Sequence, residues 1–344
     1  MASTAENIYH YIVHGVGVRS NRRLDFLGKT NEPCTAALSI WSGTIGALRE
    51  RYSELDWTQL TDAVPGQAKP ASVFMRQWRA QGEVYACHSG DSVHQIVAIL
   101  SGRGDRIDVG WSNPDSLPEA AFLEIAAIDY FMANLLAVAL RLAGQVVLHG
   151  NCVQVDGRAL IWIGEKGVGK STLGAAFVAA GYPLLADDQV VVWPVGDGYG
   201  VAPGVRRLRL WPESMTALAP ASAAVPLQQP FGAAIKGYVT TPADGPTEDL
   251  RAMAPLAAIY LLQPRGNNAS AHIETPTLGQ RLQLLHTHCF GRQHLALNDT
   301  QRRVEFRRLG ELVRQTPVRL IRLPDQLDAL PAAVNTIVSQ TSDL

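Results

Sequence analysis

The sequence predicts an α/β fold preceded by a smaller, β-rich N-terminal module. Up to about residue 110, short strand-like runs alternate with Gly, Asn, Asp and Ser, which is typical of a mostly β segment. After residue 145 the order becomes strand, glycine-rich loop, helix and strand, the order of an α/β unit. We therefore expect a module at residues 1–144 that ends in a long helix, and an α/β domain at residues 145–344.

The strands expected in the N-terminal module are short apolar, β-prone runs bounded by turn residues. They are Tyr9–Val13, Ser72–Met75, Glu83–Cys87, His94–Leu100 and Ile107–Trp111.

The helix that closes the module is expected to begin at Ser116 or Pro118 and to end at Gly144. Its apolar stretch, Ala120–Leu142, has the length of a membrane span but is interrupted by polar and charged residues. The interrupting residues are Glu124, Asp129, Asn134 and Arg141. This pattern predicts a buried or half-buried helix instead of a membrane span.

The expected α/β domain starts with three short β-rich runs before the glycine-rich loop: Val146–His149, Cys152–Val155 and Ala159–Ile163. A helix at Ser171–Ala180 follows the loop and is expected to end at Gly181, because glycine commonly terminates helices. The later expected elements are strands at Leu184–Ala186, Gln189–Trp193 and Ala257–Leu262 and a C-terminal helix at Leu327–Ser339.

The composition limits the classes of partner and compartment. A formal net charge of −1 over 344 residues argues against a nucleic-acid binder with a broad cationic face. The four cysteines are far apart in sequence without a CxxC spacing, as expected of reduced thiols in the cytosol. The first residues lack the basic and apolar regions of a signal peptide. We expect a soluble, cytoplasmic protein that acts neither on nucleic acid nor at a membrane.

The glycine-rich loop at Gly164–Ser171 matches the phosphate-binding pattern G-x-x-x-x-G-K-[ST] at every fixed position. Glycines let backbone N–H groups turn toward phosphate oxygens, and the following helix points its positive end at them. Lys170 is expected to contact the β- and γ-phosphates, and the Ser171 hydroxyl to bind Mg²⁺. The residues expected to bind the nucleotide are Gly164, Glu165, Lys166, Gly167, Val168, Gly169, Lys170, Ser171 and Thr172.

Three residues near the loop have the chemistry of a transfer site. His149 lies one hairpin upstream, and Asp187 and Asp188 lie one helix downstream. Of two adjacent carboxylates, one can accept a proton from an attacking hydroxyl while the other binds Mg²⁺. Taken one at a time, a histidine in an apolar run is often a core residue and an Asp-Asp pair is often a turn. Their joint spacing around the loop favours the functional interpretation.

From His149 to Asp188 the sequence resembles the catalytic domain of HPr kinase/phosphorylase, which has His-Gly, a hairpin, G-x-x-G-x-G-K-S, a helix and Ala-Asp-Asp at this spacing. The resemblance implies an ATP-dependent serine kinase with Mg²⁺. It implies that Asp187 is the general base, that Asp188 lies near the metal, and that His149 and Lys170 support catalysis. It also makes a homo-oligomer possible.

The sequence departs from that family beyond the two aspartates. Val205–Pro212 stands where those kinases carry a second glycine-rich signature, and the N-terminal module differs from theirs. The layout is similar to a divergent subgroup that includes kinases acting on a C-terminal serine of lasso-peptide precursors. This likeness implies a ribosomally made precursor peptide as the acceptor. Alternatives are HPr itself, free serine or another small molecule, and a nucleotide sensor without transfer activity.

Charged residues and residues of metal-binding types also occur outside these motifs. Arg207 and Arg209 share one face of an expected strand and are candidates for binding an acceptor, with a solvated face as the equal alternative. Lys236 is a weaker candidate for the γ-phosphate. A zinc site at His286, His288, Cys289 and His294 matches no familiar spacing. Solvation is expected for the basic cluster Arg302, Arg303, Arg307 and Arg308.

Overall fold

The structure is a computed structural model. It describes residues 7–24, 27, 35–58, 77–81, 83–90, 95–111, 121–218, 224–226, 237–240, 249–266, 271–292, 295 and 297–342. Over these residues the fold is mixed α/β, with two large mixed sheets and a small antiparallel one. Among the helices so described, none is long and apolar enough to cross a membrane.

The N-terminal sheet has the strand order β1-β2-β3-β7-β6-β5-β4. Its strands, in chain order, are β1 (Tyr9–Val13), β2 (Val16–Ser20), β3 (Leu38–Thr44), β4 (Gln77–Gln81), β5 (Val84–Gly90), β6 (Gln95–Ser101) and β7 (Arg106–Trp111). The described residues of this segment are mostly in strands, and β1 has the predicted bounds. The expected strand Ser72–Met75 lies outside the described residues.

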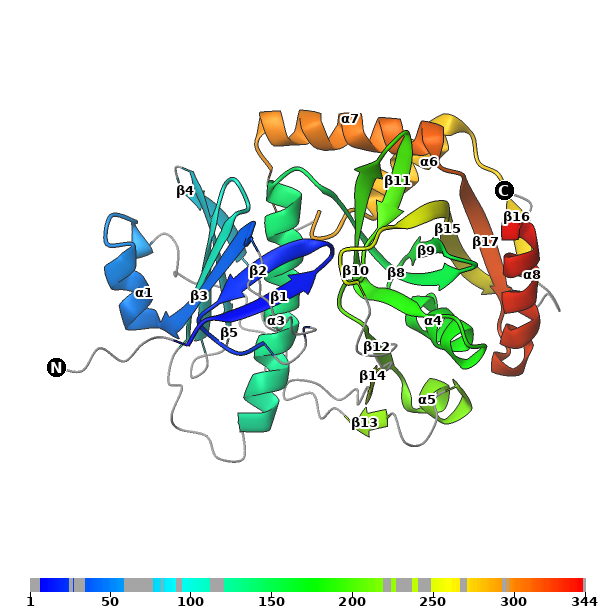
Figure 1. Cartoon of the computed structure of the whole chain (residues 1–344), viewed down its shortest axis with the longest axis horizontal. Coiled ribbons are helices and arrows are strands. Elements are labelled where there is room, and N and C mark those ends of the chain that lie inside the picture. The colour runs from blue at the N-terminus through cyan, green and yellow to red at the C-terminus, as the bar shows by residue number, and fades with distance from the viewer. Residues whose placement is uncertain are drawn as a thin grey trace.

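Two helices accompany this sheet. The short α1 (Ile45–Arg51) is capped by the Thr44 side chain, which accepts a hydrogen bond from the backbone N–H of Ala47 at 3.1 Å. The long α3 (Ala121–Leu142) runs between the two large sheets (Figure 1). From Met132 to Leu142 its apolar side chains are buried, as the sequence predicted. The predicted start at Ser116 or Pro118 lies outside the described residues.

The second large sheet has the order β11-β10-β8-β9-β15-β17-β16. Its strands, in chain order, are β8 (Val146–Val155), β9 (Arg158–Gly164), β10 (Leu184–Val195), β11 (Gly198–Val201), β15 (Ala254–Gly266), β16 (His272–Glu274) and β17 (Val318–Pro324). The central β9, β15 and β17 are parallel, whereas β8 pairs antiparallel with β9 and β10 pairs antiparallel with β8. The glycine-rich loop leaves the carboxyl end of β9.

Helices cover both faces of this sheet (Figure 1). On one face, α4 (Lys170–Ala179) and α8 (Leu330–Ser342) bury residues such as Phe177 and Ile337. On the other, α6 (Leu278–Thr287) and α7 (Asp299–Gln315) contribute to a separate cluster. The C-terminal helix starts later than predicted, because Leu327–Ala329 forms a 3₁₀ turn, η1, ahead of α8.

A small three-stranded sheet contacts α4 and β10 through its first strand. It consists of β12 (Arg207–Leu210), β13 (Ala224–Pro226) and β14 (Gly237–Thr240), and α5 (Pro212–Leu218) follows β12. The predicted basic strand is therefore present, and its Leu208 and Leu210 are buried while the arginines between them are half-buried.

The two large sheets share one apolar cluster. Residues of α3 lie in it together with Val147, Val191 and Phe290 from the second half of the chain. Next to it, the Arg141 guanidinium of α3 donates to the Glu305 carboxylate of α7 at 2.5 and 2.9 Å, and both side chains are buried. The two halves are therefore held together by packing and by a buried ion pair.

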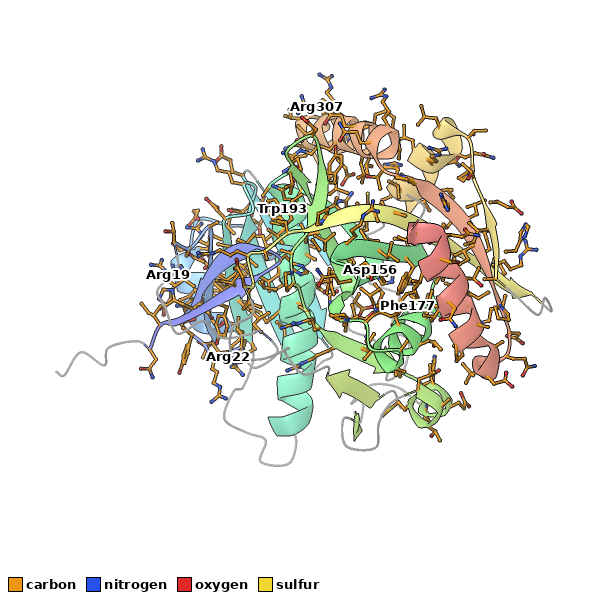
Figure 2. All side chains as sticks on the ribbon, turned by 45° about the vertical axis from the view of Figure 1, so that its right-hand side comes forward. Arg19, Arg22, Asp156, Phe177, Trp193 and Arg307 are labelled. Carbon is orange, nitrogen blue, oxygen red and sulfur yellow. The ribbon has the colours of Figure 1, made fainter. Side chains whose placement is uncertain are left out.

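A second contact joins the halves at the tip of the β1–β2 hairpin. His14 and Gly15 form a turn with φ of 53° and 77°. The backbone N–H of His14 donates to Pro203 O at 2.7 Å, and Trp193 Nε1 donates to His14 O at 2.9 Å. Figure 2 shows Trp193 where the N-terminal hairpin meets the second sheet.

Candidate active site

The glycine-rich loop joins β9 to α4, and its glycines are required by its shape. Gly167 and Gly169 have φ of 88° and 107°, a region that residues with a side chain rarely adopt. At Gly164 a Cβ would lie 2.9 Å from the Val168 side chain and 3.0 Å from Leu262 O. Glu165 and Lys166 are exposed, and Val168 is half-buried. The loop therefore packs closely at its start and faces solvent at its tip.

Lys170 is the first residue of α4 and points back into the loop. Its Nζ donates to Gly164 O at 2.8 Å and to Glu165 O at 3.1 Å, and the side chain is largely buried. The α4 N-cap is Gly169, and no side chain caps the first N–H groups of the helix. A buried ammonium and the uncapped positive end of a helix thus lie together, an arrangement that suits an anion.

Asp187 is held by donors from three other segments. Its carboxylate accepts from Asn151 Nδ2 at 3.1 Å, from Ser171 Oγ at 3.2 and 3.4 Å, and from the backbone N–H of Arg209 at 3.2 Å. Burial and the neighbouring Asp188 charge raise the pKa of Asp187 to about 7, against the opposing effect of these hydrogen bonds. This carboxyl group is fixed in position and has a pKa close to neutral pH.

Asp188 differs from its neighbour in exposure. Its φ of 65° is left-handed, and its carboxylate lies 3.8 Å from Arg209 Nη1 with 27% of the side chain exposed. The two adjacent carboxylates therefore face different surroundings, one buried under α4 and one at the surface of the site.

His149 lies on β8 beside the aspartates, because β8 and β10 pair with Asp188 opposite Gly150 and Gln189 opposite His149. Burial lowers the pKa of His149, with the Lys170 charge acting in the same direction and the Asp188 charge against it. Its ring also lies near the Asp188 backbone, which favours the charged imidazole and opposes this lowering of the pKa. The imidazole is consequently neutral at neutral pH and near Asp188.

The structure brings most of the predicted site residues together. His149, Lys170, Ser171, Asp187 and Asp188 surround the carboxyl end of β9 and the start of α4. Thr172 points to α5, where its hydroxyl lies 3.3 Å from Ser214 Oγ.

The two arginines of β12 differ in what the structure shows of them. Arg209 lies at the site through its contacts with both aspartates. Arg207 is on the same strand face two residues earlier and is half-buried.

Asn151 was missed by the sequence interpretation. It is fully buried, and α4 makes room for it with Gly174, where a Cβ would lie 2.6 Å from Asn151 Nδ2. Its only sequence signal was a polar residue between two apolar runs, which is also the pattern of a turn.

Of the remaining candidates, His288 lies next to the site, because its backbone O accepts a hydrogen bond from the backbone N–H of His149 at 2.8 Å. Within the described part of the chain, no cluster of three His, Cys, Asp or Glu side chains could hold a metal ion, and His294 lies outside that part. Lys236 also lies outside it.

Figure 2 shows Arg307 on the outer face of α7, and Arg302 and Arg303 are likewise exposed, as expected. Arg308 differs from the expectation of a solvated face, because it is half-buried and donates to Gln145 Oε1 at 3.0 Å.

The chemistry of the donor set fits a magnesium ion and a phosphate chain. The Ser171 hydroxyl and the two carboxylates are oxygen ligands of the kind that Mg²⁺ prefers. Because Ser171 donates its proton to Asp187, the lone pairs of its oxygen are available to a cation.

Comparison with known proteins gives a local similarity. No protein-family model matches the chain. An HPr kinase/phosphorylase of Caldanaerobacter subterraneus is 39% identical over 69 residues, 20% of this chain and 23% of that protein. One from Lactobacillus delbrueckii is 40% identical over 68 residues, 20% of this chain and 22% of that protein. A putative HPr kinase/phosphorylase 2 of Oceanobacillus iheyensis is 35% identical over 74 residues, 22% of each chain. The matches thus span about a quarter of the curated relatives.

Proposed function

We propose that this chain is an ATP-dependent kinase that transfers the γ-phosphate to a serine hydroxyl of a peptide or small protein. The observation that carries the proposal is the placement of Lys170, Ser171 and Asp187 around one loop. The local similarity to HPr kinase/phosphorylases supports the same chemistry. Gly164–Ser171 matches the pattern of loops that bind nucleoside triphosphates, and we therefore take a nucleoside triphosphate as the ligand of this site.

In this proposal the loop amides and the start of α4 bind the phosphate chain, and Lys170 neutralises charge on the β- and γ-phosphates. Ser171 and Asp188 are the residues we assign to Mg²⁺, which supplies charge neutralisation of the transferred group when bound. We assign to His149, which lies on β8 next to the strand position opposite Asp188, the role of orienting that residue.

Asp187 is the residue to which we assign the proton of the acceptor serine. A general base is most effective when its pKa lies near the working pH, and burial raises the pKa of Asp187 to about 7. The hydrogen bonds from Asn151 and Arg209 N–H fix the carboxylate orientation. Asp188 is the second candidate for the base, because its carboxylate is the more exposed of the two.

The acceptor is proposed to bind near β12 and the residues that follow it. Arg209 lies beside the aspartates and offers a cationic contact, and Trp211, two residues later and 43% accessible, offers an apolar one. We take a ribosomally made precursor peptide as the first acceptor to test and HPr as the second.

The test is transfer from ATP with Mg²⁺ to each acceptor, followed by mass spectrometry. We expect Asp187→Asn to lower kcat about 10²- to 10⁴-fold with little change in ATP affinity. Asp188→Asn is expected to raise the Mg²⁺ concentration needed for half-maximal rate. Asp197→Asn, an exposed control on the β10–β11 turn, should behave like the wild type.

Two outcomes would contradict these assignments. If the wild type binds ATP but phosphorylates neither acceptor nor free serine, the chain is a nucleotide sensor and the kinase proposal is wrong. If Asp188→Asn abolishes transfer at saturating Mg²⁺ while Asp187→Asn does not, the proton goes to Asp188.

A further inference from the structure

The chain that follows α6 returns to the second large sheet beside the glycine-rich loop. β9 pairs with β8 only as far as Gly150, and its chain then turns into the loop. Along the preceding residues of β8, β10 holds one edge and residues 288–290 hold the other. There the backbone N–H of His149 donates to His288 O at 2.8 Å. His288 therefore lies where β9 ends and the loop begins.

The half-buried side chain of His288 is surrounded by charged groups of the candidate active site. Burial lowers the pKa of the His288 ring, and the Glu165 charge opposes this shift. The Lys170 and His149 charges lower the pKa further. The ring is therefore neutral at neutral pH, lies toward the loop, and keeps one N–H donor.

His286, two residues earlier on α6, has different neighbours. The centroid of its ring lies 6.4 Å from that of Phe306 on α7. Burial and the Arg292 charge lower the pKa of His286, and the Glu305 charge opposes them. These groups lie outside the candidate active site, so of the two histidines it is His288 that is near the loop.

Lys170 indicates which phosphate group would lie near His288. Its Nζ donates to Gly164 O at 2.8 Å and to Glu165 O at 3.1 Å, which holds the ammonium at the start of the loop. The β- and γ-phosphates that we assign to this ammonium would therefore lie beside Glu165. In the proposed function the γ-phosphate is the one that faces the two aspartates, and His149, opposite His288, lies beside them. The phosphate within reach of the His288 ring is thus the γ-phosphate.

Given the proposed nucleotide site, we propose that His288 is a further residue of this site and that its imidazole donates a hydrogen bond to the γ-phosphate. Such a bond is charge-assisted, because the phosphate oxygens are ionised. His288 lies outside the segment His149–Asp188 that resembles HPr kinase/phosphorylase, in a stretch where the sequence indicated at most a zinc site. It reaches the loop because the chain after α6 replaces β9 at the edge of β8.

The test compares two ligands on each variant by calorimetry with Mg²⁺: the β,γ-imido analogue of ATP, which is not hydrolysed, and ADP, which lacks the γ-phosphate. We expect His288→Ala to weaken binding of the analogue about tenfold, because a hydrogen bond to a charged group is lost. The affinity for ADP should stay within about twofold of wild type. Since both affinities are measured on one preparation, partial unfolding lowers the number of sites and leaves the ratio of the two affinities unchanged.

Two conservative variants separate a hydrogen bond from packing. His288→Asn and His288→Gln each keep an N–H donor, one near the place of each ring nitrogen, and at least one of them should recover most of the affinity for the analogue. If neither does, the His288 ring acts by packing and the proposal is wrong.

The matched control is His286→Ala, the same change two residues away on the side of Phe306, and it should keep the wild-type ratio of the two affinities. An unchanged ratio in His288→Ala, or an equal loss of ADP affinity, would contradict the assignment of His288 to the γ-phosphate. If the wild type binds neither ligand, the phosphate site at the loop is wrong and the assignment fails with it. If the expected ratios are found but no acceptor is phosphorylated, the kinase proposal is wrong and the assignment of His288 holds.

Discussion

At the scale of single residues, the position of Asp187 depends on Asn151. The amide of Asn151 contacts the carboxylate at 3.1 Å and occupies the space that Gly174 leaves in α4. Glycine inside a helix normally costs stability relative to alanine. At this position it leaves room for a buried side chain that in turn holds a site residue.

Gly174→Ala is therefore expected to destabilise the protein, because its Cβ would displace the buried Asn151 amide. Overpacking of this kind costs about 1–3 kcal/mol. Gly310→Ala in α7 is the matched control, since its Cβ would meet nothing closer than Arg314 Nη1 at 3.9 Å. That control should gain about 0.5–1 kcal/mol from helix propensity. Urea unfolding measures both, and equal stabilisation by the two changes would show that Asn151 is not fixed under α4.

The sequence could predict the residues of the site more easily than their contacts. The motif Gly164–Ser171 and the spacing to Asp187 and Asp188 are local patterns that one chain segment displays. The contacts of Asn151 and the Arg209 backbone with Asp187 join segments that are far apart in sequence. No periodicity within either segment indicates which partner it will meet.

At the scale of elements, the polar residues of the site interrupt the apolar sequence pattern of two long strands. β8 was predicted as two runs, separated at Gly150 and Asn151, and β10 as two runs, separated at Asp187 and Asp188. Both continue as single strands, because neighbouring strands and α4 satisfy the polar groups. A polar interruption in an apolar run therefore indicates either a turn or a buried site, and the sequence pattern is the same for both.

The β1–β2 hairpin tip is a second element whose partner was not predictable. The His14 ring packs against Gly204, where a Cβ would lie 2.2 Å from its Cε1. The next residue, Val205, accepts a hydrogen bond from the backbone N–H of Asp187 at 2.9 Å. The N-terminal sheet therefore supports the segment that pairs with the strand of the site.

The buried His14 should make stability depend on pH. Burial lowers the pKa of His14 from 6.5 to about 4, so the folded state disfavours the charged ring. The neutral His14 ring contributes fully to the free energy of unfolding above pH 6.5. This contribution is lost as the pH falls from 6.5 toward 4, by up to about 3 kcal/mol. His14→Asn keeps a residue that tolerates the left-handed φ and should flatten this part of the stability curve. Parallel slopes for the two proteins in urea unfolding between pH 7 and 4 would contradict the assignment.

At the scale of the whole molecule, the two large sheets are joined through α3. Its Arg141 is buried against Glu305 and also donates to Phe290 O at 3.0 Å. The predicted division into residues 1–144 and 145–344 follows a change in sequence pattern. The shared apolar cluster crosses that division, and a composition change along the chain contains no information about which surfaces will pack together.

Glu305→Ala is expected to destabilise the whole protein, because it leaves the buried Arg141 charge without its carboxylate. Breaking a buried ion pair in this way costs about 3–5 kcal/mol. The double variant Arg141→Met, Glu305→Leu should recover most of the loss, since both charges are removed together. Asp299→Ala, which breaks an exposed pair with Arg302 on the same helix, should cost less than about 1 kcal/mol. Thermal unfolding that shows similar losses for Asp299→Ala and Glu305→Ala would contradict this account.

The ion pair between α3 and α7 also has a consequence for the order of events during synthesis. Arg141 and Glu305 are 164 residues apart, so the N-terminal sheet leaves the ribosome long before its packing partners in the second half. Contacts between such distant segments form slowly. Until Phe290 and α7 have been translated, α3 can pack only against the earlier residues of that half, such as Val147 and Val191, and the buried Arg141 lacks its carboxylate partner. The nascent chain is thus expected to depend on chaperones until its last third has been made.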